Sequence, residues 1–254
     1  MPVSARMHHE TLIGRQGATP TIVRHLIYLH GFGSSPASTK ARLFVERLAP
    51  LGTEARCPDL NEPEFSTLTT TRMVEQVEQE MISLPPGPIA LVGSSLGGFV
   101  AYHVAVRQAL ARAAGVPVRS PVDRLVLLAP ALDFGRASLG ALDAEGLEQW
   151  RLTDRHDVMH YALNRIMPIR YALYEDAQTY DSFVGRLPTP MLIFQGRRDD
   201  VVDPSMVVRF AASRSSVSVR LLDDDHSLGA SLELIWGESA RFLGLHQRGF
   251  EGGS

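Results

Sequence analysis

The chain has 254 residues and a formal net charge of −3 at pH 7, with 44% hydrophobic and 21% charged residues. This length suits one α/β domain, and this residue balance can supply a large hydrophobic core. The slightly negative charge argues against nucleic acid or an anionic membrane surface as a partner. The single cysteine, Cys57, excludes an intrachain disulfide and lacks the partner thiols of a structural zinc site.

The N-terminal segment carries charges and histidines but lacks the apolar region of a signal peptide. No apolar run approaches the length of a membrane span. We therefore expect a cytoplasmic protein without a membrane-spanning segment. A stretch near Thr11 to Gly14 is a candidate edge strand.

Short apolar runs typical of buried parallel strands alternate with segments whose apolar residues repeat at helical spacing. The predicted strands are residues 26–29, 54–57, 88–92, 125–128, 191–194 and 217–222. Predicted helices lie between and after them, over 41–48, over 73–84, from 98 until just before Gly115, and over 227–243. This alternation predicts an α/β fold with a mainly parallel sheet and helices on both faces.

The alternation breaks between Pro130 and Pro188, where no buried strand is predicted. Helix-like patterns occupy 139–150, 158–167 and 171–180 instead. A long insertion inside a compact domain needs a role. We interpret 131–187 as a small helical cap inserted into a core formed by 1–130 and 188–254. The alternative is a helix-rich crossover that only covers the sheet.

Residues 93–97 read Gly-Ser-Ser-Leu-Gly and lie between a predicted strand and a predicted helix. A Gly-x-Ser-x-Gly sequence in that context is typical of a nucleophile elbow, a tight turn that strains the backbone of its middle residue. The helix N-terminus then favours negative charge beside the serine hydroxyl. Ser95 is therefore the candidate nucleophile. The alternative is a Gly/Ser turn without chemistry.

A serine nucleophile needs a base and a third group that orients the base, in the chain order serine, acid, histidine for this kind of fold. Three aspartates follow the fifth predicted strand. We favour Asp199, which is nearest to the strand, with Asp200 as the alternative. Asp203 precedes a proline and is typical of a helix N-cap. His226 follows the last predicted strand and is the candidate base.

An oxyanion hole needs backbone N–H donors close to the nucleophile. We expect one from Leu96, directly after the serine, and one from Phe32 in the loop after the first predicted strand. We interpret the neighbouring His30 as a residue that braces this loop rather than as a proton carrier.

Three further histidines fit the role of base less well. His103 follows the predicted elbow on its helix and is interpreted as a packed or surface residue. His156 and His160 have the spacing of one helix face, but no third metal ligand is evident, so we predict no metal site.

Four segments resemble the signatures of the α/β-hydrolase superfamily, in the same order: His30-Gly31-Phe32, 93–97, Gly196-x-x-Asp199-x-x-Val202 and Asp225-His226. Residues 29–41 resemble more specifically a group of small bacterial serine esterases whose oxyanion loop reads His-Gly-Phe-x-Ser-Ser-Pro. The resemblance spans roughly 26–227 except for the insertion. It implies hydrolysis of an ester, thioester or amide through an acyl-enzyme, without a cofactor.

We therefore expect a serine carboxylesterase-type hydrolase with a small-molecule acyl ester as substrate. A thioesterase or an acyltransferase with the same triad is the alternative. A non-catalytic hydrolase-fold binding protein is a further alternative, which the presence of every triad residue disfavours. The predicted wall of the acyl pocket combines Phe32 with aromatic residues of the insertion, namely Trp150, Tyr161, Tyr171 and Tyr174. Packing of the insertion onto the domain is the alternative role of these four side chains.

Overall fold

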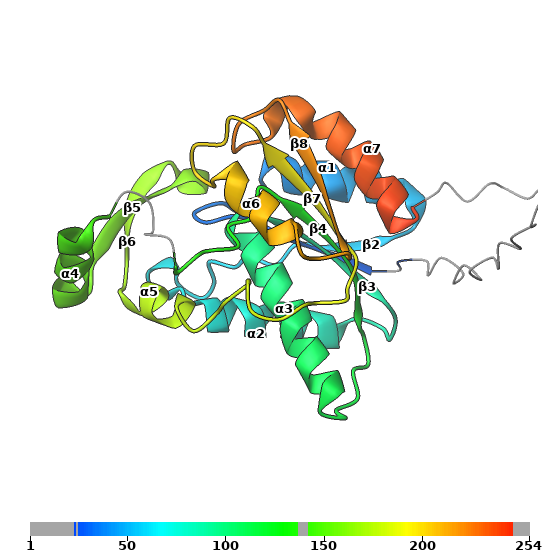
Figure 1. Cartoon of the computed structure of the whole chain (residues 1–254), viewed down its shortest axis with the longest axis horizontal. Helices are drawn as coiled ribbons and strands as arrows, with labels where there is room; N and C mark the ends of the chain where they lie inside the picture. The colour runs from blue at the N-terminus through cyan, green and yellow to red at the C-terminus, as the bar shows by residue number, and fades with distance from the viewer. Residues whose placement is uncertain (1–22, 24, 137–141, 246–254) are drawn as a thin grey trace, which may run out of the picture.

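The computed structural model describes residues 23, 25–136 and 142–245 (Figure 1). Its centre is a six-stranded sheet in the order β2-β1-β3-β4-β7-β8, with every pair of neighbours parallel. The strands are β1 (His25–Leu29), β2 (Glu54–Arg56), β3 (Ile89–Ser94), β4 (Val122–Leu128), β7 (Met191–Gly196) and β8 (Val217–Leu222). The predicted parallel sheet is confirmed, whereas the candidate edge strand near Thr11 lies outside the described residues.

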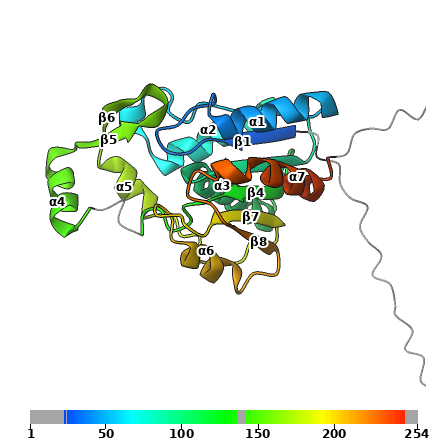
Figure 2. The same ribbon diagram turned by 90° about the horizontal axis from the view of Figure 1, so that it is seen from above.

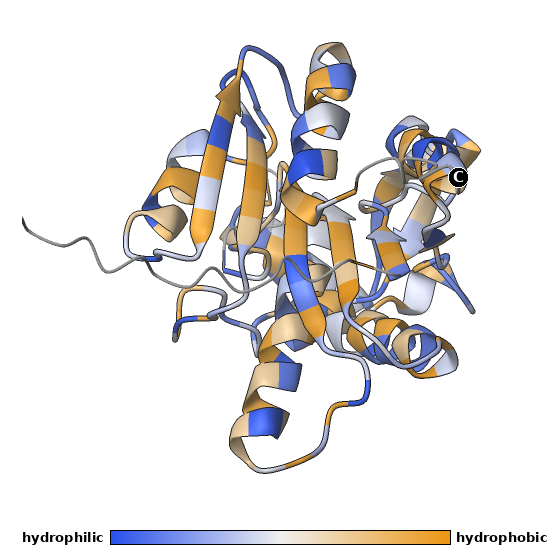
Figure 3. Cartoon of the chain, turned by 90° about the vertical axis from the view of Figure 1, so that its right-hand side faces the viewer, coloured by the Kyte–Doolittle hydropathy of each residue, from blue (hydrophilic) through white to orange (hydrophobic). Residues whose placement is uncertain are grey.

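The sheet separates two hydrophobic cores, because successive side chains of a strand point to opposite faces. In β1, Ile27 and Leu29 belong to one core, and Leu26 and Tyr28 to the other. The first core is completed by α2 (Thr70–Ser83), α3 (Leu96–Ala113) and α6 (Pro204–Ala211), and the second by α1 (Thr39–Leu48) and α7 (Leu232–Leu243). Figure 1 shows α1 and α7 above the sheet and α2 and α3 below it, and Figure 3 shows the apolar residues of the strands.

The carboxyl ends of the six strands lie at the same edge of the sheet, since all strands run in one direction. In open parallel sheets, this edge is where binding sites form. The loops after β1, β3, β7 and β8 carry Phe32, Ser95, Asp199 and His226, so the fold brings these residues to one edge. None of the helices in the described ranges combines the length and the apolar character needed to cross a bilayer.

The insertion lies at one end of the molecule, at the left of Figures 1 and 2. It contains α4 (Ala144–Thr153), the antiparallel strands β5 (His156–His160) and β6 (Arg165–Ile169), and α5 (Ala172–Ala177). The prediction of a wholly helical insertion is wrong in one place, because the segment 158–167 forms a β-hairpin instead of a helix. The helix predicted over 139–150 occurs later in the chain, as α4, and the helix predicted over 171–180 is shorter, as α5. Residues 139–141 lie outside the described ranges.

The hairpin has two local causes. Asn164 adopts the left-handed conformation, with φ of 48°, and reverses the chain after a short 3₁₀ turn. Pro168 has no N–H to donate within a helix, so it disfavours a continuous helix here. Val158 then pairs with Met167, and both pack against the core of the domain.

The insertion is fastened to the domain beside the predicted oxyanion loop. The Ala162 N–H donates to the Gly33 carbonyl at 3.0 Å, and the Arg170 N–H donates to the Ser66 carbonyl at 3.0 Å. The Asp176 carboxylate accepts from the N–H and the hydroxyl of Thr71, at 2.8 and 2.6 Å. The hairpin therefore lies next to the edge of the sheet where the site residues gather.

Candidate active site

Ser95 occupies a strained turn between β3 and α3. Its φ of 51° and ψ of −115° are unusual for a residue with a side chain. The turn is closed by glycines, because a Cβ atom on Gly97 would lie 2.2 Å from the Leu29 carbonyl oxygen, and one on Gly93 would lie 2.3 Å from the Gly97 carbonyl oxygen. Gly-x-Ser-x-Gly is therefore required by the geometry of the turn, and the turn presents the Ser95 hydroxyl at the start of α3.

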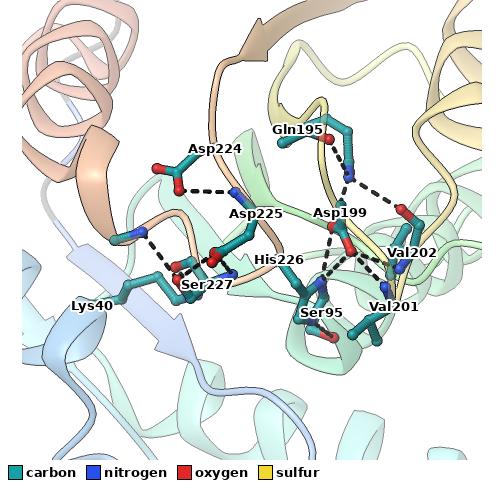
Figure 4. Close-up of polar contacts among 12 residues, drawn as sticks. Lys40, Ser95, Gln195, Asp199, Val201, Val202, Asp224, Asp225, His226 and Ser227 are labelled. Atoms are coloured by element: carbon teal, nitrogen blue, oxygen red, sulfur yellow. Dashed lines mark hydrogen bonds and ion pairs between the residues drawn. The ribbon is translucent and has the colours of Figure 1, made fainter.

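The side chains of Ser95, His226 and Asp199 form one hydrogen-bonded chain (Figure 4). Nε2 of His226 lies 3.1 Å from Oγ of Ser95, and Nδ1 lies 3.0 and 2.9 Å from the two carboxylate oxygens of Asp199. An ionised carboxylate only accepts hydrogen bonds, so Nδ1 carries the proton. In the neutral imidazole, Nε2 is then the acceptor for the Ser95 hydroxyl.

The Asp199 side chain is fully buried, and both of its carboxylate oxygens accept hydrogen bonds from neighbouring residues. Its Oδ1 accepts from the N–H groups of Val201 and Val202 at 2.9 and 2.8 Å, and its Oδ2 accepts from Nε2 of Gln195 at 2.7 Å. Burial by itself raises the pKa of Asp199, but hydrogen bonds from His226 and from the Val202 and Val201 N–H groups outweigh it and lower the pKa below its usual value. The carboxylate is thus held ionised while it faces His226.

Gln195 is a site residue that the sequence analysis did not identify. It lies at the end of β7 with its side chain fully buried, and its amide holds Asp199 in the orientation that reaches His226. In the amino-acid sequence, the signal for this role is the position of Gln195 directly before the Gly196 turn. The inward direction of its side chain depends on the register of β7 in the sheet.

The other two aspartates of this loop do not reach His226 in the described structure. Asp200 is exposed. Asp203 caps α6, because its carboxylate accepts from the Ser205 N–H at 2.8 Å, which confirms its interpretation as an N-cap.

His226 stands on a loop rather than at the start of the final helix. The predicted helix over 227–243 begins later, with a 3₁₀ turn from Gly229 and α7 from Leu232. Asp225 accepts from the Ser227 N–H at 2.8 Å, and Leu228 has a φ of 55°, so the chain turns before the helix begins. This turn directs His226 towards Ser95.

Of the two predicted oxyanion donors, Leu96 directly follows Ser95 in the chain, and Phe32 directly follows Gly31. Gly31 packs against Ser95, since a Cβ on Gly31 would lie 3.4 Å from the Ser95 Cβ. Among the described residues, no acceptor is found for the backbone N–H of Phe32 or of Leu96. His30 braces the loop, because its Nδ1 lies 2.9 Å from the Gly31 carbonyl and its Nε2 accepts from the Leu60 N–H at 3.0 Å.

The predicted aromatic wall divides into two groups. Phe32 packs on Phe65, with ring centroids 5.4 Å apart, and Tyr161 stands at the tip of the hairpin with 72% of its surface exposed. Trp150 is 1% exposed and packs with Tyr171 and Tyr174, while its indole N–H donates to the Ile169 carbonyl at 3.1 Å. This placement favours the packing role for these three residues of the insertion.

His156 and His160 lie on strand β5, so their spacing does not place them on one face of a helix. His160 packs its ring on Phe65, with centroids 4.7 Å apart. Within the described ranges, no cluster of three histidine, cysteine, aspartate or glutamate side chains has an arrangement suited to a metal ion.

His103 is a packed residue of α3, as expected. It is 4% exposed, and its Nε2 lies 3.0 Å from the Ser182 hydroxyl. Burial lowers the pKa of His103 to about 4.

This burial predicts acid sensitivity of the fold. The unfolded chain takes up the His103 proton near pH 6.5, and the folded chain only near pH 4, so the free energy of unfolding falls as the pH drops between these values. We expect His103 to account for about 3 kcal/mol of this loss. In urea titrations at pH 7 and pH 4, His103→Gln should show a weaker pH dependence than the wild type. Ser182→Ala should retain the wild-type dependence, and equal dependence in His103→Gln would contradict the prediction.

Comparison with known proteins places the chain in a family. A model of the family described as "Uncharacterised protein family (UPF0227)" matches residues 25–237. The chain belongs to this family. The matched segment contains Ser95, Asp199 and His226, whereas a comparison with curated proteins gives no match.

Solved structures similar to this UPF0227 chain show its fold. A putative hydrolase from Agrobacterium vitis S4 has 22% sequence identity and a TM-score of 0.76, over 87% of this chain and 88% of its own. Alpha/beta hydrolase domain-containing protein 10 from mouse has 22% identity and a TM-score of 0.70, over 91% and 93%. Est1E from Butyrivibrio proteoclasticus, solved with ferulic acid bound, has 20% identity and a TM-score of 0.71, over 86% and 87%. The chain thus has the α/β-hydrolase fold, as its motifs indicated.

Proposed function

We propose that this protein is a serine carboxylesterase-type hydrolase that cleaves small-molecule acyl esters through an acyl-enzyme. The observation that carries the proposal is the continuous chain from Ser95 through His226 to the buried carboxylate of Asp199. A serine, a base and an orienting acid in this geometry are the parts that nucleophilic acyl transfer requires.

In the first half of the reaction, Ser95 Oγ attacks the ester carbonyl carbon while Nε2 of His226 takes the hydroxyl proton. Asp199 accepts a hydrogen bond from the Nδ1–H group throughout, so it keeps the imidazole in one tautomer and stabilises its charged form. The tetrahedral intermediate expels the alcohol, which receives the proton from Nε2, and leaves the acyl group on Ser95. Water then attacks the acyl-enzyme by the same route and releases the acid.

The negative oxygen of each tetrahedral intermediate needs hydrogen-bond donors that exist before the reaction. We assign this role to the backbone N–H groups of Phe32 and Leu96. Their lack of acceptors among the described residues and the position of Leu96 at the start of α3 support the assignment. The triad requires no cofactor for this chemistry.

A panel of p-nitrophenyl esters with increasing acyl length tests the function. We expect hydrolysis by the wild type, with turnover that depends on the acyl chain. A matched thioester and an added alcohol distinguish the thioesterase and acyltransferase alternatives, which would favour the thioester or transfer the acyl group to the alcohol. Absence of turnover on every ester and thioester would contradict the proposal and favour a non-catalytic binding protein.

We further propose that residues 131–187 act as a cap that shapes substrate choice, with Tyr161 rather than Trp150 at the substrate. Tyr161 directly precedes Ala162, whose N–H contacts the oxyanion loop at Gly33, whereas Trp150 is enclosed within the insertion. The aromatic residues Tyr171 and Tyr174 pack on Trp150 and serve to hold the cap together.

Alanine substitutions separate these two roles. Tyr161→Ala should leave the melting temperature nearly unchanged and shift the acyl-length preference several-fold, equivalent to about 1 kcal/mol of differential transition-state binding. Trp150→Ala should cost about 3–5 kcal/mol of stability and lower the rates for all substrates together. Unchanged substrate ratios in Tyr161→Ala would direct the search for the acyl pocket to Phe32 and the loop 58–68.

A further inference from the structure

Lys40 is the only lysine in the chain, although the sequence contains 25 lysine and arginine residues in total. Arginine serves every other basic position, including surface ion pairs such as Arg47 with Glu233 and Arg220 with Glu238. The two residue types differ chemically, because lysine presents a compact ammonium and arginine a broad planar fork. A lysine in this arginine-rich chain therefore points to a place where an ammonium is needed.

The local structure around Lys40 disfavours a cation. Lys40 is the second residue of α1, which begins at Thr39 after the N-cap residue Ser38. The N-terminus of a helix carries partial positive charge, so a cation there is unfavourable for the helix. The reason for this lysine must lie in its tertiary contacts.

The tertiary contact of Lys40 is with the loop that carries the proposed base (Figure 4). Its Nζ donates to the backbone carbonyl of Ser227 at 2.9 Å, and Ser227 directly follows His226. The side chain is half-buried. Burial lowers the pKa of Lys40, and the negative charges of Asp199, Asp225 and Asp224 oppose this shift. These carboxylates, from the two loops that carry the proposed acid and base, thus favour the ammonium form of Lys40.

The contact between Lys40 and Ser227 joins two segments on opposite sides of the candidate site. α1 follows the oxyanion loop after β1, whereas His226 follows β8, and the strands β3, β4 and β7 separate β1 from β8 in the sheet. The His226 loop has its own turn contacts through Asp225, but these bonds are local to the loop. Lys40 is a direct link between this loop and the segment that leads from the proposed oxyanion donor.

We propose that Lys40 is a positioning residue for the hydrolysis proposed above, and that its ammonium fixes the His226 loop relative to the oxyanion loop. It touches neither the substrate nor the reacting atoms. Its loss should therefore misplace Nε2 of His226 and lower kcat while KM stays nearly constant. Misplacement of a catalytic group by about 1 Å can cost about 100-fold in rate.

The test restores the ammonium chemically. Lys40→Cys is prepared in a Cys57→Ser background, so that residue 40 carries the only thiol. Alkylation with 2-bromoethylamine returns a primary ammonium on a side chain of nearly lysine length, whereas iodoacetamide adds a neutral group. Mass spectrometry verifies both products, and kcat and KM on p-nitrophenyl acetate are measured for each.

We expect the neutral form to lose about 10- to 100-fold in kcat with KM within about 2-fold of the parent, and the aminoethylated form to regain most of this loss. Lys40→Met provides a second variant with similar length and no charge, and should match the neutral form. Arg47→Met is the control, because it breaks a contact of α1 with Glu233 of α7 rather than with the His226 loop, and should leave kcat unchanged.

Equal kcat in the two alkylated forms, or a Lys40→Met variant with wild-type kcat, would overturn the positioning role while the proposed hydrolase activity stood. If the wild type itself hydrolyses no ester, the proposed function fails instead, so the two failures are distinguishable.

Discussion

Ser95→Ala should reduce ester hydrolysis by about 10⁶-fold in turnover while the fold remains intact. Loss of the serine removes the nucleophile and with it the covalent route, which explains the size of this effect. Alanine has the same backbone requirements as serine, so the strained turn at φ 51° persists in the variant. The measurement is kcat on a p-nitrophenyl ester, combined with the melting temperature.

The neighbouring serine provides the matched control. Ser94 ends β3 and is buried, but its hydroxyl is not part of the chain to His226. Ser94→Ala should retain most of the activity. A Ser95→Ala variant with wild-type turnover, or an inactive Ser94→Ala variant that is folded, would contradict the assignment of the nucleophile.

Asp199→Asn should lower turnover by about 10⁴-fold. The asparagine fits the same space, but its amide can present an N–H to His226 where the carboxylate presented an acceptor, which favours the wrong tautomer of the imidazole. The pKa of Asp199 is lowered in the folded state, so its carboxylate contributes stability that is present at neutral pH and is lost as the pH falls through its folded-state pKa. The substitution should therefore also reduce the acid sensitivity of the fold.

Two aspartates of the same loop separate this effect from a general loss of charge. Asp200→Asn should leave turnover nearly unchanged, because Asp200 is exposed and makes no contact with His226 in the described structure. Asp203→Asn should do the same, because asparagine is also a good N-cap, and should cost at most about 1 kcal/mol. If Asp200→Asn is the inactive variant, the acid is assigned one residue out of register.

The positions of Ser95, Asp199 and His226 were predictable because they follow local rules. Each residue stands directly after a strand that its apolar run identifies, and parallel strands bring their carboxyl ends to one edge. Gly93 and Gly97 mark the elbow in the amino-acid sequence itself, since only a glycine fits so close to neighbouring backbone. Asp199 was preferred over Asp200 for its distance from the strand, and the structure places it against His226.

The features that sequence reasoning missed depend on contacts between distant residues. The β5–β6 hairpin is defined by pairing such as Val158 with Met167, which the helix-like spacing of apolar residues did not reveal. Gln195 reaches Asp199 only because β7 has a particular register in the sheet. The contact from Lys40 to the Ser227 carbonyl joins opposite ends of the chain, and no local pattern encodes it.

The most direct measurement of the central claim is the site of covalent labelling by an organophosphonate. The reagent resembles the tetrahedral intermediate and reacts with a hydroxyl only where a base and an oxyanion site are assembled around it. We expect mass spectrometry of the labelled wild type to show one adduct, on Ser95, and His226→Ala to abolish it. An adduct on another serine, or an unlabelled Ser95 in the folded protein, would contradict the account.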